Sequence, residues 1–336
     1  MSRILITGGA GFIGAHLAKV CVAAGHEVHV VLRPGSDDER LRPLGDDIVR
    51  HGFDLQSEAA LKHCLSEVQP DRIFHLAARP RRRESPDFAD AAEGVREHLQ
   101  TLVSLLGAAA TTRRPPAVFI RSGSLAEYGL APAPYHETSR ETPVTTYGAE
   151  LAAATHLIGG LQTRLPFPVI TARLALVYGP SQATDYLMPS LIRRCLTGEP
   201  SIVRHPRDRR DLLYIDDVVD ALLRLGESRL PGPTIVNIAS TIAPTMREVA
   251  QMVVEQTGAD PRLIEYGADD QSSGIVDLRG SADKAHELIG WRAHIPLVEG
   301  VARTVAWYRK HTCAGGSPRK AGYLDGACEN RTGVRQ

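Results

Sequence analysis

A glycine-rich turn near the start of the chain, in the segment ITGGAGFIGAHL (residues 6–17), constrains the fold more than any other feature. The turn follows an apolar run, RILIT, and opens a helical pattern. This arrangement lets backbone N–H groups approach a pyrophosphate at a helix N-terminus. We therefore predict a dinucleotide site formed by Gly8, Gly11, Phe12, Ile13 and Gly14. The alternative is an ordinary tight turn between a strand and a helix.

Short apolar runs alternate with helical patterns through the first two thirds of the chain, which is typical of βαβ units around a parallel sheet. The predicted strands are RILIT, HVVL, IVRHG, RIFHLA, AVFIRS and VITARL. The predicted helices between them include HLAKVCVAAG, EAALKHCLSEV and EHLQTLVSLLGAA. The expected fold class is α/β, a Rossmann-type doubly wound parallel sheet.

The regular alternation ends after about Tyr178. LMPSLIRRCLTG, MREVAQMVVEQTG and LVEGVARTVAWYRK then read as helices between turns that contain proline or glycine. We expect an NADP-binding Rossmann domain over residues 1–178, to which residues 211–240 return. A smaller C-terminal substrate-binding domain is expected mainly over residues 179–311, and a loose tail over residues 312–336.

The charges of the chain balance, because 39 Lys and Arg residues face 39 Asp and Glu residues. A balanced chain has no broad cationic field for nucleic acid or for an acidic membrane, so we predict a small-molecule partner. The five cysteines are scattered without metal-ligand spacing, and no metal is expected. The chain begins without an export signal pattern, which favours a cytoplasmic location.

Several further segments carry a resemblance to a known family. With the glycine turn, they are FDL (53–55), HLAA (75–78), VYGP (177–180) and RRDLLYIDDVV (209–219). Together they resemble the extended short-chain dehydrogenase/reductase family, which contains nucleotide-sugar epimerases and dehydratases. The resemblance covers most of residues 3–310. It implies that Asp54 holds the adenine and that Ala77 and Ala78 lie along the cofactor, and it assigns their neighbours Leu55, Leu76 and Arg79 to the same site. For Asp54 the alternative is a helix or turn cap.

The end of the second predicted strand indicates which dinucleotide binds. NAD-using relatives place an acid there for the ribose hydroxyls, whereas this chain has Leu32, followed by Arg33 and Ser36. A guanidinium and a hydroxyl can bind the 2′-phosphate that an acid would repel. The residues favour NADP, and the alternative is that Arg33 is a solvated loop residue.

The resemblance assigns catalysis to Ser124, which would orient the substrate carbonyl, and to Tyr147, which would transfer a proton. The family's lysine, one helical turn after the tyrosine, is Leu151 here. An unperturbed phenol has a pKa of about 10, so without the lysine Tyr147 stays protonated at neutral pH and suits reduction of a ketone. Alternatives are that Tyr147 is a core aromatic residue and that Ser124 caps a turn.

The substrate segments depart from the family in a similar way. Leu176 replaces the asparagine that usually helps to hold a substrate diphosphate, although Arg210 matches a family arginine that can touch it. Arg210 has the alternative of pairing with Asp211 or Asp208. The basic run RPRRRESPDF (79–88) reads as a solvated loop or an anion site. His98 stands where relatives often carry asparagine and is a weak candidate for a proton relay.

The leading prediction is an NADPH-dependent ketoreductase that reduces a ketone to a secondary alcohol. Because it lacks this lysine, the chain resembles atypical ketoreductases of antibiotic biosynthesis, such as the one that acts on the angucyclinone polyketide of simocyclinone. An aromatic polyketide is therefore the predicted substrate. A nucleotide-sugar 4-ketoreductase, epimerase or dehydratase is the first alternative. A non-catalytic NADP-binding sensor or scaffold is the second. The resemblance also implies a homodimer that pairs through helices at residues 92–112 and 146–164.

Overall fold

Seven parallel strands form the central sheet within the part of the chain that the computed structural model describes, residues 1–79, 82, 85–268 and 274–312. Their order across the sheet is β11-β6-β5-β4-β1-β2-β3. They span Arg3–Thr7 (β1), Glu27–Leu32 (β2), Ile48–Gly52 (β3), Arg72–His75 (β4), Val118–Ser124 (β5), Val169–Leu174 (β6) and Thr234–Ile238 (β11). The prediction of a doubly wound Rossmann-type sheet is confirmed.

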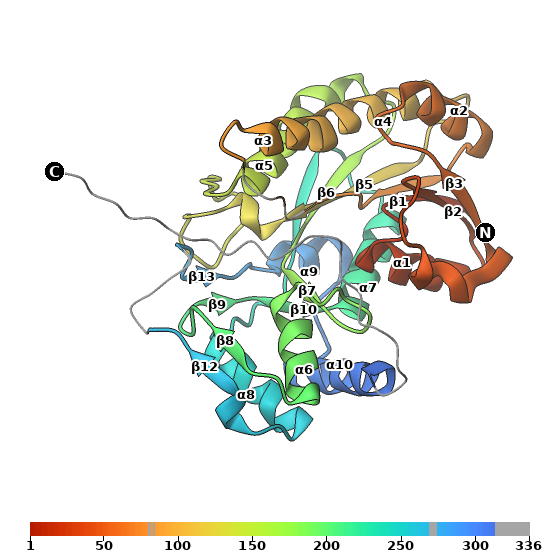
Figure 1. Ribbon diagram of the computed structural model, residues 1–336. Helices are drawn as coiled ribbons and strands as arrows, with labels where there is room; N and C mark the ends of the chain where they lie inside the picture. Colours follow the sequence, from red (N-terminus) through yellow and green to blue (C-terminus); the bar gives the residue numbers. More distant parts are fainter. Residues whose placement is uncertain (80–81, 83–84, 269–273, 313–336) are drawn as a thin grey trace.

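Helices cover both faces of this sheet (Figure 1). One face carries α1 (Phe12–Ala23) and α7 (Ile215–Glu227), which pack against each other. The other face carries α2 (Glu58–Val68), α3 (Ala89–Gly94), the π-helix η2 (Val95–Gln100), α4 (Thr101–Ala110) and α5 (Thr146–Leu161). Because both faces are covered, a central strand such as β6 can be buried along its whole length.

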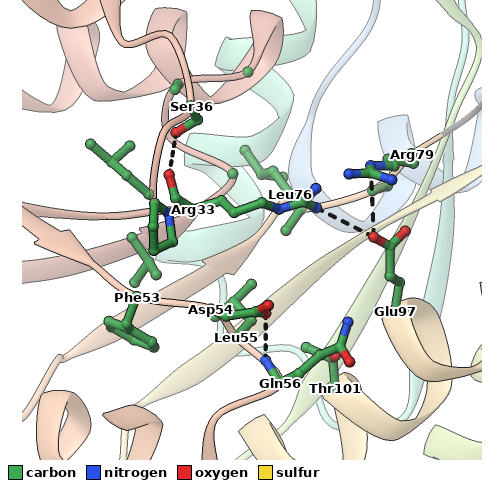
Figure 2. Close-up of a pocket in the computed structure, with 18 of the residues that line it drawn as sticks. Arg33, Ser36, Phe53, Asp54, Leu55, Gln56, Leu76, Arg79, Glu97 and Thr101 are labelled. Atoms are coloured by element: carbon green, nitrogen blue, oxygen red, sulfur yellow. Dashed lines mark hydrogen bonds and ion pairs between the residues drawn. The ribbon is translucent and has the colours of Figure 1, made fainter. Parts of the chain in front are cut away.

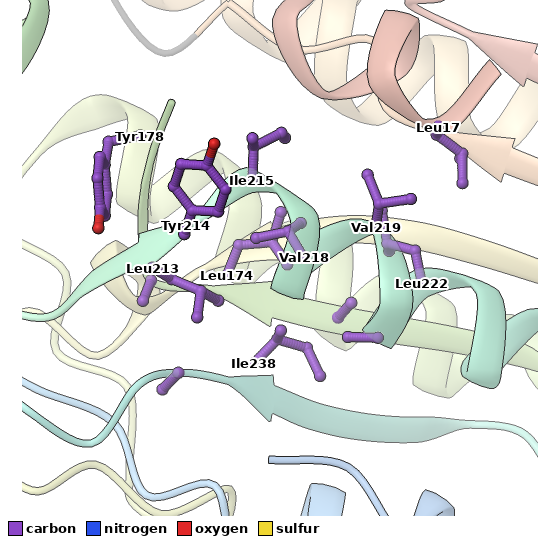
Figure 3. Packing of buried hydrophobic residues seen from close by; sticks show 14 of the residues in the cluster. Leu17, Leu174, Tyr178, Leu213, Tyr214, Ile215, Val218, Val219, Leu222 and Ile238 are labelled. Atoms are coloured by element: carbon purple, nitrogen blue, oxygen red, sulfur yellow. The ribbon is translucent and has the colours of Figure 1, made fainter. Parts of the chain in front are cut away.

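The core between the sheet and α7 is built from aliphatic side chains (Figure 3). Val218 and Leu222 on the inner face of α7 lie near Leu174 of β6 and Ile238 of β11 in one buried cluster. Leu17 of α1 belongs to the same cluster. This packing joins β11 and α7, which come late in the chain, to the sheet begun by the glycine turn.

The remaining elements form a smaller layer at the carboxyl end of the sheet (Figure 1). Its helices are α6 (Leu187–Thr197), α8 (Met246–Thr257), α9 (Asp283–Ile289) and α10 (Leu297–Thr312). Its short strands are β7 (Leu176–Tyr178), β8 (Ser201–Val203), β9 (Arg209–Arg210), β10 (Leu212–Tyr214), β12 (Ile264–Tyr266) and β13 (Asp277–Leu278). Elsewhere in the described residues, the 3-10 helices are η1 (Glu39–Asp47), η3 (Leu125–Glu127), η4 (Gln162–Arg164) and η5 (Pro261–Leu263). In the described part of the chain, no helix is long and apolar enough to span a membrane.

Two predicted boundaries differ from the structure for physical reasons. Helix α1 starts at Phe12, directly after the glycine turn, so it contains Phe12 and Ile13 rather than beginning near His16. The helix expected over residues 97–109 divides into η2 and α4, where the Thr101 hydroxyl donates to the Arg96 carbonyl (3.0 Å). The expected tail falls outside the described residues from residue 313 on.

Candidate active site

A cavity of about 430 Å³ opens where β1, β2, β3 and β4 end (Figure 2). Gly8 and Gly11 line it from the glycine turn, and segments after the next three strands line it together with residues of η2 and α4. The cavity thus lies outside the carboxyl ends of parallel strands, where this fold binds dinucleotides. It receives these residues predicted for the cofactor: Gly8, Gly11, Arg33, Ser36, Asp54, Leu55, Leu76, Ala77, Ala78 and Arg79.

Gly8 and Gly14 are two positions of the glycine turn that leave room only for hydrogen. A Cβ on Gly8, which has a φ of 72°, would lie 2.8 Å from the backbone N of Ala77. A Cβ on Gly14 would lie 2.3 Å from the Gly8 carbonyl oxygen. Gly14 therefore packs closely against the backbone of the turn at Gly8, while Phe12 and Ile13 are partly buried against the core. A narrow backbone cradle beside a helix N-terminus fits the pyrophosphate of a dinucleotide.

Two of the predicted cofactor residues also make local bonds. The carboxylate of Asp54 accepts a bond from the backbone N–H of Gln56 (2.9 Å), so it caps a turn at the cavity wall. The hydroxyl of Ser36 donates to the Arg33 carbonyl (2.7 Å). Both side chains still line the cavity (Figure 2). For Asp54 the turn cap and the position beside the adenine are therefore compatible.

Glu97 is a site residue that the sequence reasoning missed. It lies on η2 and lines the cavity, and its carboxylate meets Arg33 Nη2 at 3.3 Å and Arg82 Nη2 at 3.1 Å. Arg79 Nε lies 3.7 Å away. Figure 2 shows the Arg33 side chain reaching across the cavity toward this carboxylate. Arg33 is therefore half exposed and paired, which differs from the solvated loop residue that was the alternative.

The predicted catalytic pair does not line this cavity, but the ring of Tyr147 contacts that of His98, which does. Ser124 ends β5, and its hydroxyl accepts a bond from Ala126 N–H (3.1 Å) in a capping box with Glu127. The turn-cap alternative is thus present in the structure, and the hydroxyl proton of Ser124 stays available for another acceptor. Tyr147 lies in the first turn of α5, where the Thr145 hydroxyl accepts from Gly148 N–H (3.1 Å).

Burial raises the pKa of the Tyr147 phenol above its usual range. Leu151, one turn later on α5, is 2% exposed and brings no charge to the site. The sequence reasoning missed a cation next to α5. Arg121 of β5 donates to the Leu151 carbonyl (3.0 Å) and to the Thr155 hydroxyl (2.9 Å) of this helix. Arg121 opposes the rise in the Tyr147 pKa without cancelling it, so the phenol stays protonated at neutral pH.

His98 faces the cavity from η2 and is only 5% exposed. Its Nδ1 lies 2.6 Å from Oε2 of Glu150, which is on α5. Arg82 Nη1 donates to the same carboxylate oxygen at 2.9 Å. Gly94 of α3 leaves space for this cluster, because a Cβ there would lie 1.8 Å from Glu150 Oε1. Sequence reasoning singled out His98 but not its partner, since no short-range pattern joins positions 98 and 150.

Arg210, predicted to lie near the substrate, pairs with a neighbouring aspartate, as its alternative reading expected. Arg210 donates to Asp208 Oδ2 (2.8 Å) and to the carbonyl of Ile275 (2.8 Å), so it pairs with Asp208. Asp211 instead accepts bonds from Ser240 and from neighbouring backbone N–H groups. Leu176 is 39% exposed on β7. Within the described residues no group of His, Cys, Asp and Glu is arranged to hold a metal ion.

Fold and cavity together define a dinucleotide-binding protein of the Rossmann class. Residues 4–239 match the NAD dependent epimerase/dehydratase family, and the chain belongs to this family. Its members use a nicotinamide dinucleotide, so the coarser part of the cofactor prediction is confirmed.

Two relatives and one solved structure illustrate the similarity. The UDP-glucose 4-epimerase of Mycolicibacterium smegmatis is 28% identical over 325 residues, which cover 91% of this chain and 98% of the relative. The dTDP-D-glucose 4,6-dehydratase of Bos taurus is 24% identical over 331 residues, covering 92% and 89%. The structure of MoeE5 in complex with UDP-glucuronic acid and NAD has a TM-score of 0.80 at 29% identity and covers 92% of this chain and 99% of that one. The comparisons lend no support to an aromatic polyketide substrate.

Proposed function

We propose that the protein is an NADPH-dependent reductase of a keto group on a nucleoside diphosphate sugar. The relatives support the substrate class, since their names describe enzymes of UDP-glucose and dTDP-glucose. The direction of reaction rests on one observation, the half-buried Tyr147 phenol beside Leu151. Burial raises the pKa of this phenol, so Tyr147 is set to give a proton rather than to remove one.

Different residues of the chain would hold the cofactor, orient the ketone and donate the proton. A bound nicotinamide dinucleotide supplies the hydride, and Gly8, Gly11 and the strand-end residues around the cavity would hold it. Ser124 keeps a hydroxyl proton that can orient the ketone oxygen. Tyr147 then donates its proton to the oxygen that becomes the alcohol. An oxidation would instead need Tyr147 as a phenolate, which its raised pKa disfavours.

A second candidate is the reduction of an aromatic polyketide ketone. Two observations favour it: Leu176 presents an apolar surface where relatives would contact a diphosphate, and Arg210 is already paired with Asp208. A desolvated diphosphate facing Leu176 would lose a hydrogen-bond donor. The likeness along the whole chain to nucleotide-sugar enzymes places this candidate second.

An assay of NADPH oxidation separates the two candidates. The panel contains UDP- and dTDP-4-keto-6-deoxyglucose and polycyclic aromatic ketones, tested with the wild type, Tyr147→Phe and Leu151→Lys. We expect turnover of a ketosugar and a loss of about 100-fold or more with Tyr147→Phe. Turnover only of an aromatic ketone would favour the second candidate. Dinucleotide binding without turnover of any ketone would favour the non-catalytic alternative.

The preference for NADP is proposed from Arg33 and Ser36, which line the cavity where the adenine ribose would lie. Arg33 is held by Glu97 (3.3 Å), and a 2′-phosphate would compete for the same guanidinium. Replacing Glu97 by glutamine should therefore strengthen NADPH binding about twofold to fivefold, the range of a partly exposed ion pair. NADH binding should change less, because NADH carries no 2′-phosphate. Isothermal titration calorimetry measures both affinities.

Glu93→Gln is the matched control for this measurement. Glu93 pairs with Arg79 (3.1 Å) and does not line the cavity. Its replacement should leave the ratio of NADPH to NADH affinity unchanged. Equal strengthening of both cofactors by Glu97→Gln would contradict the assignment of Arg33 to the 2′-phosphate.

Three further predictions accompany this proposal. We propose that residues 179–311 mainly bind the substrate, since their helices and short strands form the layer at the carboxyl end of the sheet. A homodimer through the helices around residues 92–112 and 146–164, and a cytoplasmic location, stay predictions.

A further inference from the structure

His98 and Glu150 form a buried pair beside Tyr147. The 2.6 Å distance between His98 Nδ1 and Glu150 Oε2 is that of a strong hydrogen bond in which the ring N–H donates to a carboxylate. Both residues are 5% exposed. A carboxylate on Nδ1 fixes the tautomer of the neutral ring and leaves the lone pair on Nε2.

The other ring nitrogen of His98, Nε2, is available to bind a proton. His98 Nε2 is buried and has no hydrogen-bond partner among the described residues. A buried nitrogen without a partner is unusual in a folded protein and calls for an explanation. His98 lines the dinucleotide cavity, and its ring meets that of Tyr147 edge to face, with centroids 5.8 Å apart.

Tyr147 needs a source of protons if it acts repeatedly as a donor. Each donation would leave a phenolate in a place where burial raises the pKa of the phenol. A lysine at position 151 would stabilise that phenolate, and Leu151 cannot. Arg121 directs its guanidinium to Leu151 O and Thr155 Oγ1, which are acceptors on the same helix. In the described part of the chain, His98 is the titratable group whose ring contacts Tyr147.

We propose that His98, held by Glu150, returns a proton to Tyr147 after each turnover and so replaces the support that a lysine at position 151 would give. This rests on the proposed function, in which Tyr147 protonates the product oxygen. In the first step the Tyr147 O–H bond breaks as the alcohol O–H bond forms. In the second the Nε2–H bond of protonated His98 breaks and the Tyr147 O–H bond forms again. Solvent supplies the proton that Nε2 passes on, and the ring is neutral again after the transfer, so each turnover consumes one proton.

Charged and titratable groups from every neighbouring element tune this ring. Glu150 and Tyr147 approach from α5, Arg82 from the loop after β4, His75 from the end of β4, and Glu97 from the preceding position of η2. Burial lowers the pKa of His98, and Glu150 counteracts part of this effect. The ring is therefore neutral at rest at neutral pH and takes up a proton only briefly.

Comparison of single and multiple turnovers tests the relay. In His98→Gln, Tyr147 still starts protonated, so the first hydride transfer to a ketosugar should keep its rate within about twofold. The steady-state kcat should fall about tenfold to 100-fold, because each phenolate must then wait for solvent. His156→Gln is the matched control, since His156 of α5 also lies close to a glutamate (Glu141, 3.5 Å) but is exposed. Equal loss in both phases, or no loss in either, would overturn the proposal.

Nuclear magnetic resonance of protein labelled with 15N-histidine gives a readout without substrate. The relay requires that neutral His98 carries its proton on Nδ1 and that Glu150→Gln lowers the pKa of the ring. A proton on Nε2 of the neutral ring, or no titration between about pH 4 and 8, would overturn the relay. If the wild type turns over no ketone, the proposed function fails, and these spectra alone decide whether the pair is built as described.

Discussion

Replacing Arg173 by methionine should lower the free energy of unfolding by about 3 to 5 kcal/mol, the largest effect on stability that we expect from a single substitution. The Arg173 side chain is fully buried, and its Nε donates to Glu127 Oε2 at 2.9 Å. Its Nη2 lies 2.5 Å from Glu141 Oε1. Glu127 is also fully buried, so the substitution would leave its carboxylate without a cation where water cannot reach it. Urea denaturation measures the loss.

A surface ion pair serves as the control for Arg173. Arg193 pairs with Glu199 at 3.0 Å, and both side chains are partly exposed. Arg193→Met should cost less than about 1 kcal/mol, because solvent replaces the lost partner. Adding Glu127→Gln to Arg173→Met should recover part of the stability by removing the isolated charge. A loss no larger than that of Arg193→Met would contradict the description of Arg173 and Glu127 as a buried pair.

The second large effect is expected on cofactor binding. A Cβ on Gly14 would lie 2.3 Å from the Gly8 carbonyl oxygen and 2.9 Å from Gly9 Cα, and both are backbone atoms. Gly14→Ala should therefore push the turn outward and weaken NADPH binding about tenfold to 100-fold, corresponding to the cost of overpacking a tight site. Isothermal titration calorimetry gives the affinity, and circular dichroism shows whether the variant is folded.

Gly159 of α5 is the matched glycine for this comparison. A Cβ at Gly159 would meet no atom within 4 Å. Gly159→Ala should leave NADPH affinity unchanged and stabilise the helix by up to about 1 kcal/mol. Unchanged affinity in a folded Gly14→Ala protein would mean that the turn does not form the cofactor cradle.

The sequence predicts those parts of the fold in which a local pattern and burial agree. RILIT and VITARL coincide with β1 and β6, because these apolar runs are buried between two layers of helices. IVRHG coincides with β3, although this strand lies at the edge of the sheet and only Ile48 in it is fully buried. The glycine turn was equally readable, since its spacing leaves few alternatives. The π-helix η2 was not, because the backbone bond from Thr101 N–H to the Arg96 carbonyl, five residues back, leaves no signal in the apolar periodicity.

The charged surroundings of the site could not be read from local patterns. Glu97 looks like a solvated helix residue in the sequence, yet three arginines from two separate loops surround it. Arg121 lies inside a predicted strand, where a guanidinium is unexpected, and it is held by the backbone and a hydroxyl of α5. Contacts of this kind join residues that are far apart in the sequence, and only the folded chain defines them. Leu151 and Leu176, in contrast, were visible as departures from a family pattern.

Gly94 shows how much of the site's chemistry depends on a position that has no functional group. The Glu150 carboxylate and the Arg82 guanidinium occupy the volume that any side chain at residue 94 would fill. A single methyl group there would displace the partner of His98 without altering any residue that could exchange a proton. In the divergence of such enzymes, a change of glycine on α3 would thus act as a mutation of α5, and inspection of the acidic, basic and hydroxyl side chains alone would not reveal it.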